Sequence, residues 1–179
     1  MQRLYIATEK FGPCHGTGWK GYVEWSGLTQ LNELVTLDGM LCPTRLGEIK
    51  DSYWPHIVQE DNMLNFFLDL DFLLSELANP HDVNVLGLIR RPSEDVSLLA
   101  WDGFAFLGYD LMDKDVGNSA LTNCGGFPDV FSNSELSEAG LIRNFERAVE
   151  IQRTLRSKYY PREYHADCDV WAVFRRTEG

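Results

Sequence analysis

The dipeptide Asp102-Gly103 lies between two apolar segments, and this pattern constrains the fold of the chain more than any other. Both central residues of a type I′ turn need positive φ, which Asp-Gly favours, so the sequence predicts a β-hairpin that begins with residues 97–101. After the turn, the side chains of residues 104–112 alternate between two largely apolar faces. We therefore predict a central strand at 104–112 that is covered on both sides.

Alternating and β-branched residues predict further strands along the chain. The expected strands are 4–7, 22–25, 83–89 and 168–174. Residues 27–43 fit two interpretations, because their leucines form a helical stripe, whereas their Val-Thr segment before Asp38-Gly39 suits a strand and a turn. These two alternatives stay open at this point.

The surest helix is 141–159, because its apolar side chains recur at helical spacing and Pro161 follows it. A capping box, Ser132-x-x-Glu135, predicts a short helix that stops at Gly140.

Residues 63–78 are strongly apolar and fit either a single helix or a strand followed by a helix. We favour the second interpretation, because neighbouring Phe66 and Phe67 suit a strand and Asp69 is a good residue to cap a helix. Strands occur early, in the middle and last, without a regular βαβ repeat. The order predicts an α+β fold, with a mostly antiparallel sheet and helices packed on one face. At 179 residues, a single globular domain over 1–179 is the default.

Charge is unevenly distributed along the chain, whose net charge is −11. Residues 1–140 carry 8 basic and 21 acidic side chains, net −13, whereas residues 141–179 carry 8 and 6, net +2. A phosphate backbone is a poor partner for the acidic part, so nucleic acid is excluded as a partner. A basic protein is a good partner, because opposite fields steer encounter; plain solubility is the competing explanation.

Four aspartates are the candidate partner-binding residues. Asp110, Asp113 and Asp115 leave the predicted strand together, and Asp129 lies beyond them. Their spacing is not that of an EF-hand, and they could instead form a solvated face. In a further alternative, Asp110 lies under the loop 117–131 and accepts hydrogen bonds from backbone N–H groups.

Two weaker patterns point to chemistry. Cys14, His15, His165 and Cys168 have the right side chains for a tetrahedral zinc site, although adjacent Cys and His point apart unless the loop bends. The competing interpretation is a buried thiol and two surface imidazoles. No cofactor is expected, because the Gly-rich segment 11–21 lacks the residue order of phosphate-binding loops.

Cys124, in Thr-Asn-Cys-Gly-Gly, is a candidate nucleophile. His165 or His56 could serve as its base, and Asp167 or Asp169 could orient that base. The competing interpretation is a small apolar residue in a tight turn.

Targeting signals are missing from the sequence. No apolar run approaches the roughly 18 residues of a membrane helix, and the N-terminus lacks the apolar core of a signal peptide. The four cysteines are widely spaced without a CxxC motif, which favours reduced thiols. We expect a cytoplasmic protein that has no membrane partner.

In size and charge the chain is similar to bacterial immunity and antitoxin proteins, which cover the active sites of basic toxins. No motif carries this resemblance, which implies an acidic protein-binding module with a basic partner. The alternatives are a small hydrolase or transferase that uses Cys124 and a histidine, an enzyme with a zinc-bound water, and a homo-oligomer with a structural role.

Overall fold

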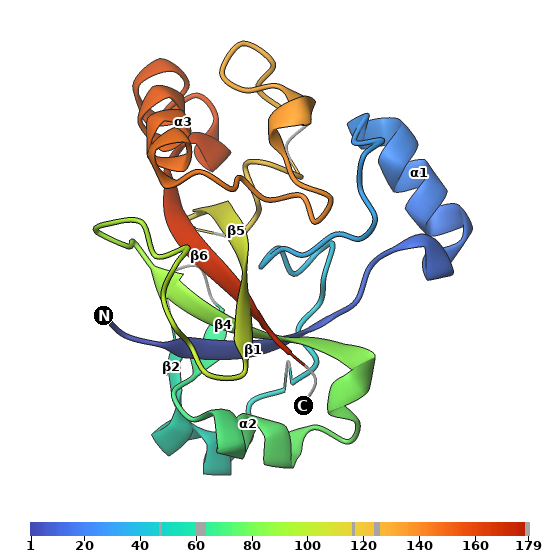
Figure 1. Ribbon diagram of the computed structural model, residues 1–179, viewed down its shortest axis with the longest axis vertical. Helices are drawn as coiled ribbons and strands as arrows, with labels where there is room; N and C mark the ends of the chain where they lie inside the picture. Colours follow the sequence, from blue (N-terminus) through green and yellow to red (C-terminus); the bar gives the residue numbers. More distant parts are fainter. Residues whose placement is uncertain (47, 60–63, 116, 124–125, 178–179) are drawn as a thin grey trace.

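One antiparallel sheet organises the computed structural model, which describes residues 1–46, 48–59, 64–115, 117–123 and 126–177 (Figure 1). The strand order is β2-β3-β1-β4-β6-β5. The strands are β1 (Leu4–Glu9), β2 (Ile57–Gln59), β3 (Asn65–Phe67), β4 (Val83–Arg90), β5 (Phe104–Asp113) and β6 (Cys168–Arg176). The helices are α1 (Thr17–Ser26), α2 (Leu70–Glu76) and α3 (Phe145–Lys158), with short 3₁₀ helices η1 (Pro13–His15), η2 (Asp51–His56), η3 (Pro80–Asp82), η4 (Asn133–Glu135) and η5 (Tyr164–Ala166). The predicted α+β class is confirmed.

One face of the sheet packs against helices. Leu73 of α2 lies in a buried cluster with Ala7 and Val85, and Ile151 of α3 lies in a second cluster with Phe174. Burial of these side chains is the main favourable contribution to the fold, at roughly 25 cal/mol per Å² of apolar surface. The prediction that helices pack against one face is confirmed.

The opposite face is covered by segments without regular structure. Leu86, Leu88 and Val173 of the sheet share a buried cluster with Val35 and Leu141. Residues 27–43, for which helix and strand were both open, therefore form neither. They make isolated backbone contacts with neighbouring segments, such as the hydrogen bond from Leu34 N to Phe11 O at 2.8 Å.

From Gly108 onward β5 is buried on both faces as predicted, whereas Ala105 is exposed, and the strand lies at the end of the sheet instead of its centre. Short backbone contacts replace a neighbouring strand along its outer side. Tyr109 exchanges two hydrogen bonds with Ile142, at 2.7 and 3.0 Å, and Leu111 O accepts one from Ala120 N at 2.8 Å. These contacts satisfy polar groups that an exposed edge strand would leave unpaired.

A turn forms at Asp102-Gly103, but the predicted hairpin is wrong. Phe104 N donates to Trp101 O at 2.9 Å, and Gly103 has a φ of 72°, whereas Asp102 has no positive φ, which excludes type I′. Residues 97–101 form no strand, and β5 pairs with β6 instead. The physical reason is that Trp101 packs its ring on Phe104 and Phe174.

Residues 22–25 are the end of α1, so the strand predicted there is also wrong. Trp19 and Tyr22 are three residues apart on one helical face, and both rings pack against Phe11. The loop predicted from its glycines at 11–21 thus contains the start of this helix.

Local signals elsewhere are confirmed. The strand-then-helix interpretation of 63–78 holds, because the Asp69 carboxylate caps α2 by accepting hydrogen bonds from Asp71 N at 2.9 Å and Phe72 N at 3.2 Å. α3 begins later than predicted, after Asn144, whose side chain accepts a hydrogen bond from Arg147 N. Among the described residues, no helix combines the length and apolar character needed to cross a membrane.

Candidate functional site

Asp110 lies inside the protein and is only 1% exposed. Its carboxylate accepts hydrogen bonds from Thr36 Oγ1 at 2.6 Å, Ser119 Oγ at 2.7 Å, Leu111 N at 2.9 Å and Leu37 N at 3.3 Å. Burial raises the pKa of Asp110, although these four donors oppose the rise. The prediction that Asp110 forms part of a surface patch is wrong, and the alternative that the loop 117–131 covers it fits the contact with Ser119.

Asp38 is buried beside Asp110, and the sequence interpretation missed it. Its carboxylate accepts hydrogen bonds from Ser119 N at 2.9 Å, Asn123 Nδ2 at 2.8 Å and Met40 N at 2.9 Å. Asp38 and Asp110 therefore fasten the same loop to the sheet. The only signal in the sequence was the dipeptide Asp38-Gly39, which indicated a turn and not a buried contact.

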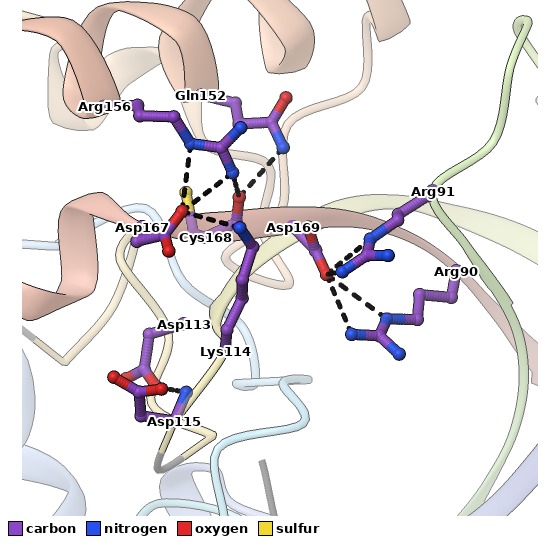
Figure 2. Close-up of polar contacts among 10 residues, drawn as sticks. All are labelled: Arg90, Arg91, Asp113, Lys114, Asp115, Gln152, Arg156, Asp167, Cys168 and Asp169. Carbon is purple, nitrogen blue, oxygen red and sulfur yellow. Dashed lines mark hydrogen bonds and ion pairs between the residues drawn. The ribbon is translucent and has the colours of Figure 1, made fainter. Parts of the chain in front are cut away.

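Asp113 is buried as well and organises the chain after β5. It accepts a hydrogen bond from the backbone N–H group of Asp115 at 3.0 Å (Figure 2), and others from those of Gly117 and Asn118, both at 3.1 Å. His165 Nδ1 also lies 3.2 Å from Asp113 Oδ2, and this hydrogen bond raises the pKa of the imidazole. Its role is thus to hold a turn and an imidazole, and it does not present a surface charge.

The two remaining predicted partner-binding residues are exposed. Asp115 is at the surface after β5, and Asp129 pairs with Lys158 Nζ and the Tyr159 hydroxyl at the end of α3. Hydrogen bonds from Lys158 and Tyr159 lower the pKa of Asp129. The four aspartates therefore do not form one acidic surface, and a partner-binding role for Asp115 and Asp129 stays a prediction.

Asp167 and Asp169 form ion pairs with basic side chains (Figure 2). Asp167 Oδ1 lies 2.7 Å from Lys114 Nζ and 2.8 Å from Arg156 Nη2. Asp169 Oδ2 lies 3.0 Å from Arg90 Nη2 and 2.7 Å from Arg91 Nη2. Among the aspartates that the structure describes, Asp113 is the one hydrogen-bonded to His165, so the predicted orienting role of Asp167 or Asp169 finds no support.

The four proposed zinc ligands do not come together. Cys14 and His15 are exposed neighbours, 3.3 Å apart between Sγ and Nδ1, whereas Cys168 is buried in β6. Burial raises the pKa of the Cys168 thiol to about 12, which disfavours the thiolate that a metal needs. Within the described ranges, no three His, Cys, Asp or Glu side chains are placed to hold a metal ion.

The nucleophile hypothesis stays a prediction, because Cys124 lies outside the described residues. Of its two candidate bases, His56 stacks on Phe72 with ring centroids 3.8 Å apart. His165 is partly exposed and held by Asp113, an arrangement that suits a general base.

Along the sequence, negative charge is concentrated in a different segment from the one predicted. Residues 46–82 contain eight acidic residues and one basic residue, net −7 of the chain's −11. This segment includes β2 at the end of the sheet, and η2 and α2, which lie side by side below it in Figure 1. The Tyr53 hydroxyl of η2 donates to Glu76 Oε2 of α2 at 2.7 Å, which holds the two together.

Large apolar side chains are exposed among these acidic residues. Trp54 is 56% exposed and Leu68 is 44% exposed. A hydrogen bond of 2.8 Å from Leu68 N to His56 O joins their two segments. We name this surface the acidic edge, and its residues are Asp51, Trp54, Leu68, Asp69 and Asp71, all exposed.

Comparison of the chain with protein-family models, with curated proteins and with solved structures gave no match. The case for a function therefore depends on the surfaces and side chains described above.

Proposed function

We propose that this chain is a protein-binding module that recognises a basic protein through the acidic edge. The observation that carries this proposal is an exposed tryptophan on a surface with three exposed aspartates, Asp51, Asp69 and Asp71, within a segment that holds net −7 of the chain's −11. A field of one sign speeds the encounter with a partner of opposite charge.

Trp54 and Leu68 distinguish this surface from one that only keeps the protein in solution. Tryptophan is enriched among the residues that contribute most to binding energy at interfaces. A polar rim around a central apolar contact is the usual arrangement of a protein–protein interface, and here the polar residues are acidic. The resemblance in size and charge to immunity and antitoxin proteins, whose partners are basic toxins, supports the same function.

The test is affinity capture from a cell lysate of the source organism with this chain as bait. The rate at which the captured protein associates with the chain is then measured. The edge variant carries Asp51→Lys and Asp71→Asn, and a second variant carries Trp54→Ala. Matched controls are Asp102→Lys with Glu94→Gln, which changes charge equally at exposed positions outside the acidic edge, and Leu98→Ala, which removes a 96% exposed apolar side chain. Thermal melting establishes that each variant folds.

The wild type and both controls should retain a basic protein that the edge variant loses. Its association rate with the wild type should fall steeply with salt, because exposed charges are screened over about 10 Å at 0.1 M ionic strength. Trp54→Ala should act mainly on dissociation. Retention of the same proteins by the wild type and by the edge variant contradicts the proposal. So does sedimentation that shows the chain pairing with itself through this surface.

A further inference from the structure

A cavity of about 460 Å³ lies where β4 begins and β6 ends. The lining of this cavity is basic, in contrast to the acidic edge. Its basic side chains are those of Lys10, Arg175 and Arg176, and its acidic side chain, among the described residues, is that of Glu33. The lining therefore carries a formal charge of +2, whereas the whole chain carries −11. An anion is therefore the favoured occupant.

The basic groups are partly committed to the protein. Arg175 pairs with Glu33 across the cavity wall, and Lys10 Nζ donates to the backbone oxygen of His81 at 2.6 Å. Both side chains are long and flexible, so either can exchange its present partner for an incoming anion. Arginine suits this exchange, because its planar fork matches a carboxylate or phosphate.

Asn84 supplies the second, independent observation. It lines the cavity, is only 1% exposed, and its Nδ2 and Oδ1 have no hydrogen-bond partner in the described part of the chain. The Thr8 hydroxyl, directly opposite on β1, is buried without a partner as well. Buried polar groups in native proteins are nearly always hydrogen-bonded, so both functions of this amide remain to be met by an occupant of the cavity or by water.

We propose that this cavity binds a small anion that also carries a planar donor–acceptor edge, such as an amide. Arg175 and Lys10 bind the carboxylate or phosphate, and the Asn84 amide pairs with the planar edge. Ala105 and Leu107 offer apolar surface to the body of the ligand. The Asn84 amide is covered in the free protein, so binding requires side chains at the cavity wall to move.

Two sources share this chemistry, namely an acylated amino acid or peptide end and a nucleotide. The test is calorimetric titration and NMR of the full chain with N-acetyl-L-leucine and with uridine 5′-monophosphate. Acetate and orthophosphate are the probes for an anion alone. The variants are Asn84→Leu, which removes the buried amide, and Arg175→Met. Arg153→Met is the matched control, because Arg153 is exposed on α3 and does not line this cavity.

One of the two organic probes should bind about tenfold more tightly than its matching simple anion. Asn84→Leu and Arg175→Met should each weaken that binding about tenfold or more, whereas Arg153→Met should not. Preference for N-acetyl-L-leucine identifies the ligand as an acylated amino acid or peptide end, and preference for uridine 5′-monophosphate identifies it as a nucleotide. The proposal is overturned if neither probe binds at about 10 mM, or if binding is unchanged by Asn84→Leu in a folded protein. If Asn84→Leu does not fold, the proposal is overturned when binding is unchanged by Arg175→Met.

Discussion

Replacing Asp110 by alanine should cost more stability than the loss of any surface charge in this protein. The carboxylate is buried at the point where β5 meets two covering segments, and it accepts four hydrogen bonds. Two come from the backbone N–H groups of Leu37 and Leu111, and two come from the hydroxyls of Thr36 and Ser119. The hydroxyls can rotate to other acceptors, but the N–H groups cannot.

The magnitude follows from these donors. Each buried N–H without an acceptor costs about 1–3 kcal/mol, so Asp110→Ala should lower the free energy of unfolding by about 3–5 kcal/mol once small relaxations are allowed. Asp110→Asn keeps one carbonyl oxygen and can donate to a hydroxyl, so it leaves one N–H unmet. Its expected cost is about 1–3 kcal/mol. Against a typical total of about 5–15 kcal/mol, the alanine variant should be close to unfolding.

The assay is urea denaturation at neutral pH, with circular dichroism and tryptophan fluorescence as independent probes. The midpoint should fall in the order wild type, Asp110→Asn, Asp110→Ala. Asp115→Ala is the matched control, because Asp115 is exposed nearby, and its effect should stay within about 0.5 kcal/mol. An Asp110→Ala variant that loses less than about 1 kcal/mol would refute the reasoning, since it would mean that the donors are satisfied without the carboxylate.

Two further predictions concern a turn and an imidazole. Gly103→Val should lower the melting temperature by an amount that corresponds to more than about 1 kcal/mol of stability. Gly103 has positive φ, and the space around it is open, so backbone strain is the only cost of the added side chain. An unchanged melting temperature would show that the turn has another conformation. The pKa of His165 is raised by its hydrogen bond to Asp113, so the stability that it contributes is present below the ordinary value of about 6.5 and is lost as pH rises through the folded value. The difference in unfolding free energy between the wild type and His165→Gln should therefore shrink from about pH 5.5 to about pH 8.5, and it should be flat in an Asp113→Asn background; a difference that grows with pH contradicts the assigned contact.

Several patterns that are complete within one segment predicted the structure well, although the Asp102-Gly103 pattern and the strand predicted at 22–25 did not. The α3 stripe, the alternation of β4 and β6, and the strand-then-helix order at 63–78 all depend on spacing along the chain and on local caps such as Asp69. The exclusion of a nucleic-acid partner was likewise drawn from charge alone, and it stays a prediction. These inferences needed only the chemistry of neighbouring residues.

Long-range contacts decided the rest, because the chain positions that meet are far apart in sequence. Asp110 lies 74 residues from Thr36, and no local pattern distinguishes a carboxylate that faces four donors from one that faces water. For the same reason the sequence could not place Asp38 beside Asp110, or show that Trp54 and Leu68 share an acidic surface. The sequence by itself determined the α+β class and most elements. Only the tertiary structure decided which acidic side chains are buried as hydrogen-bond acceptors and which are exposed at the surface.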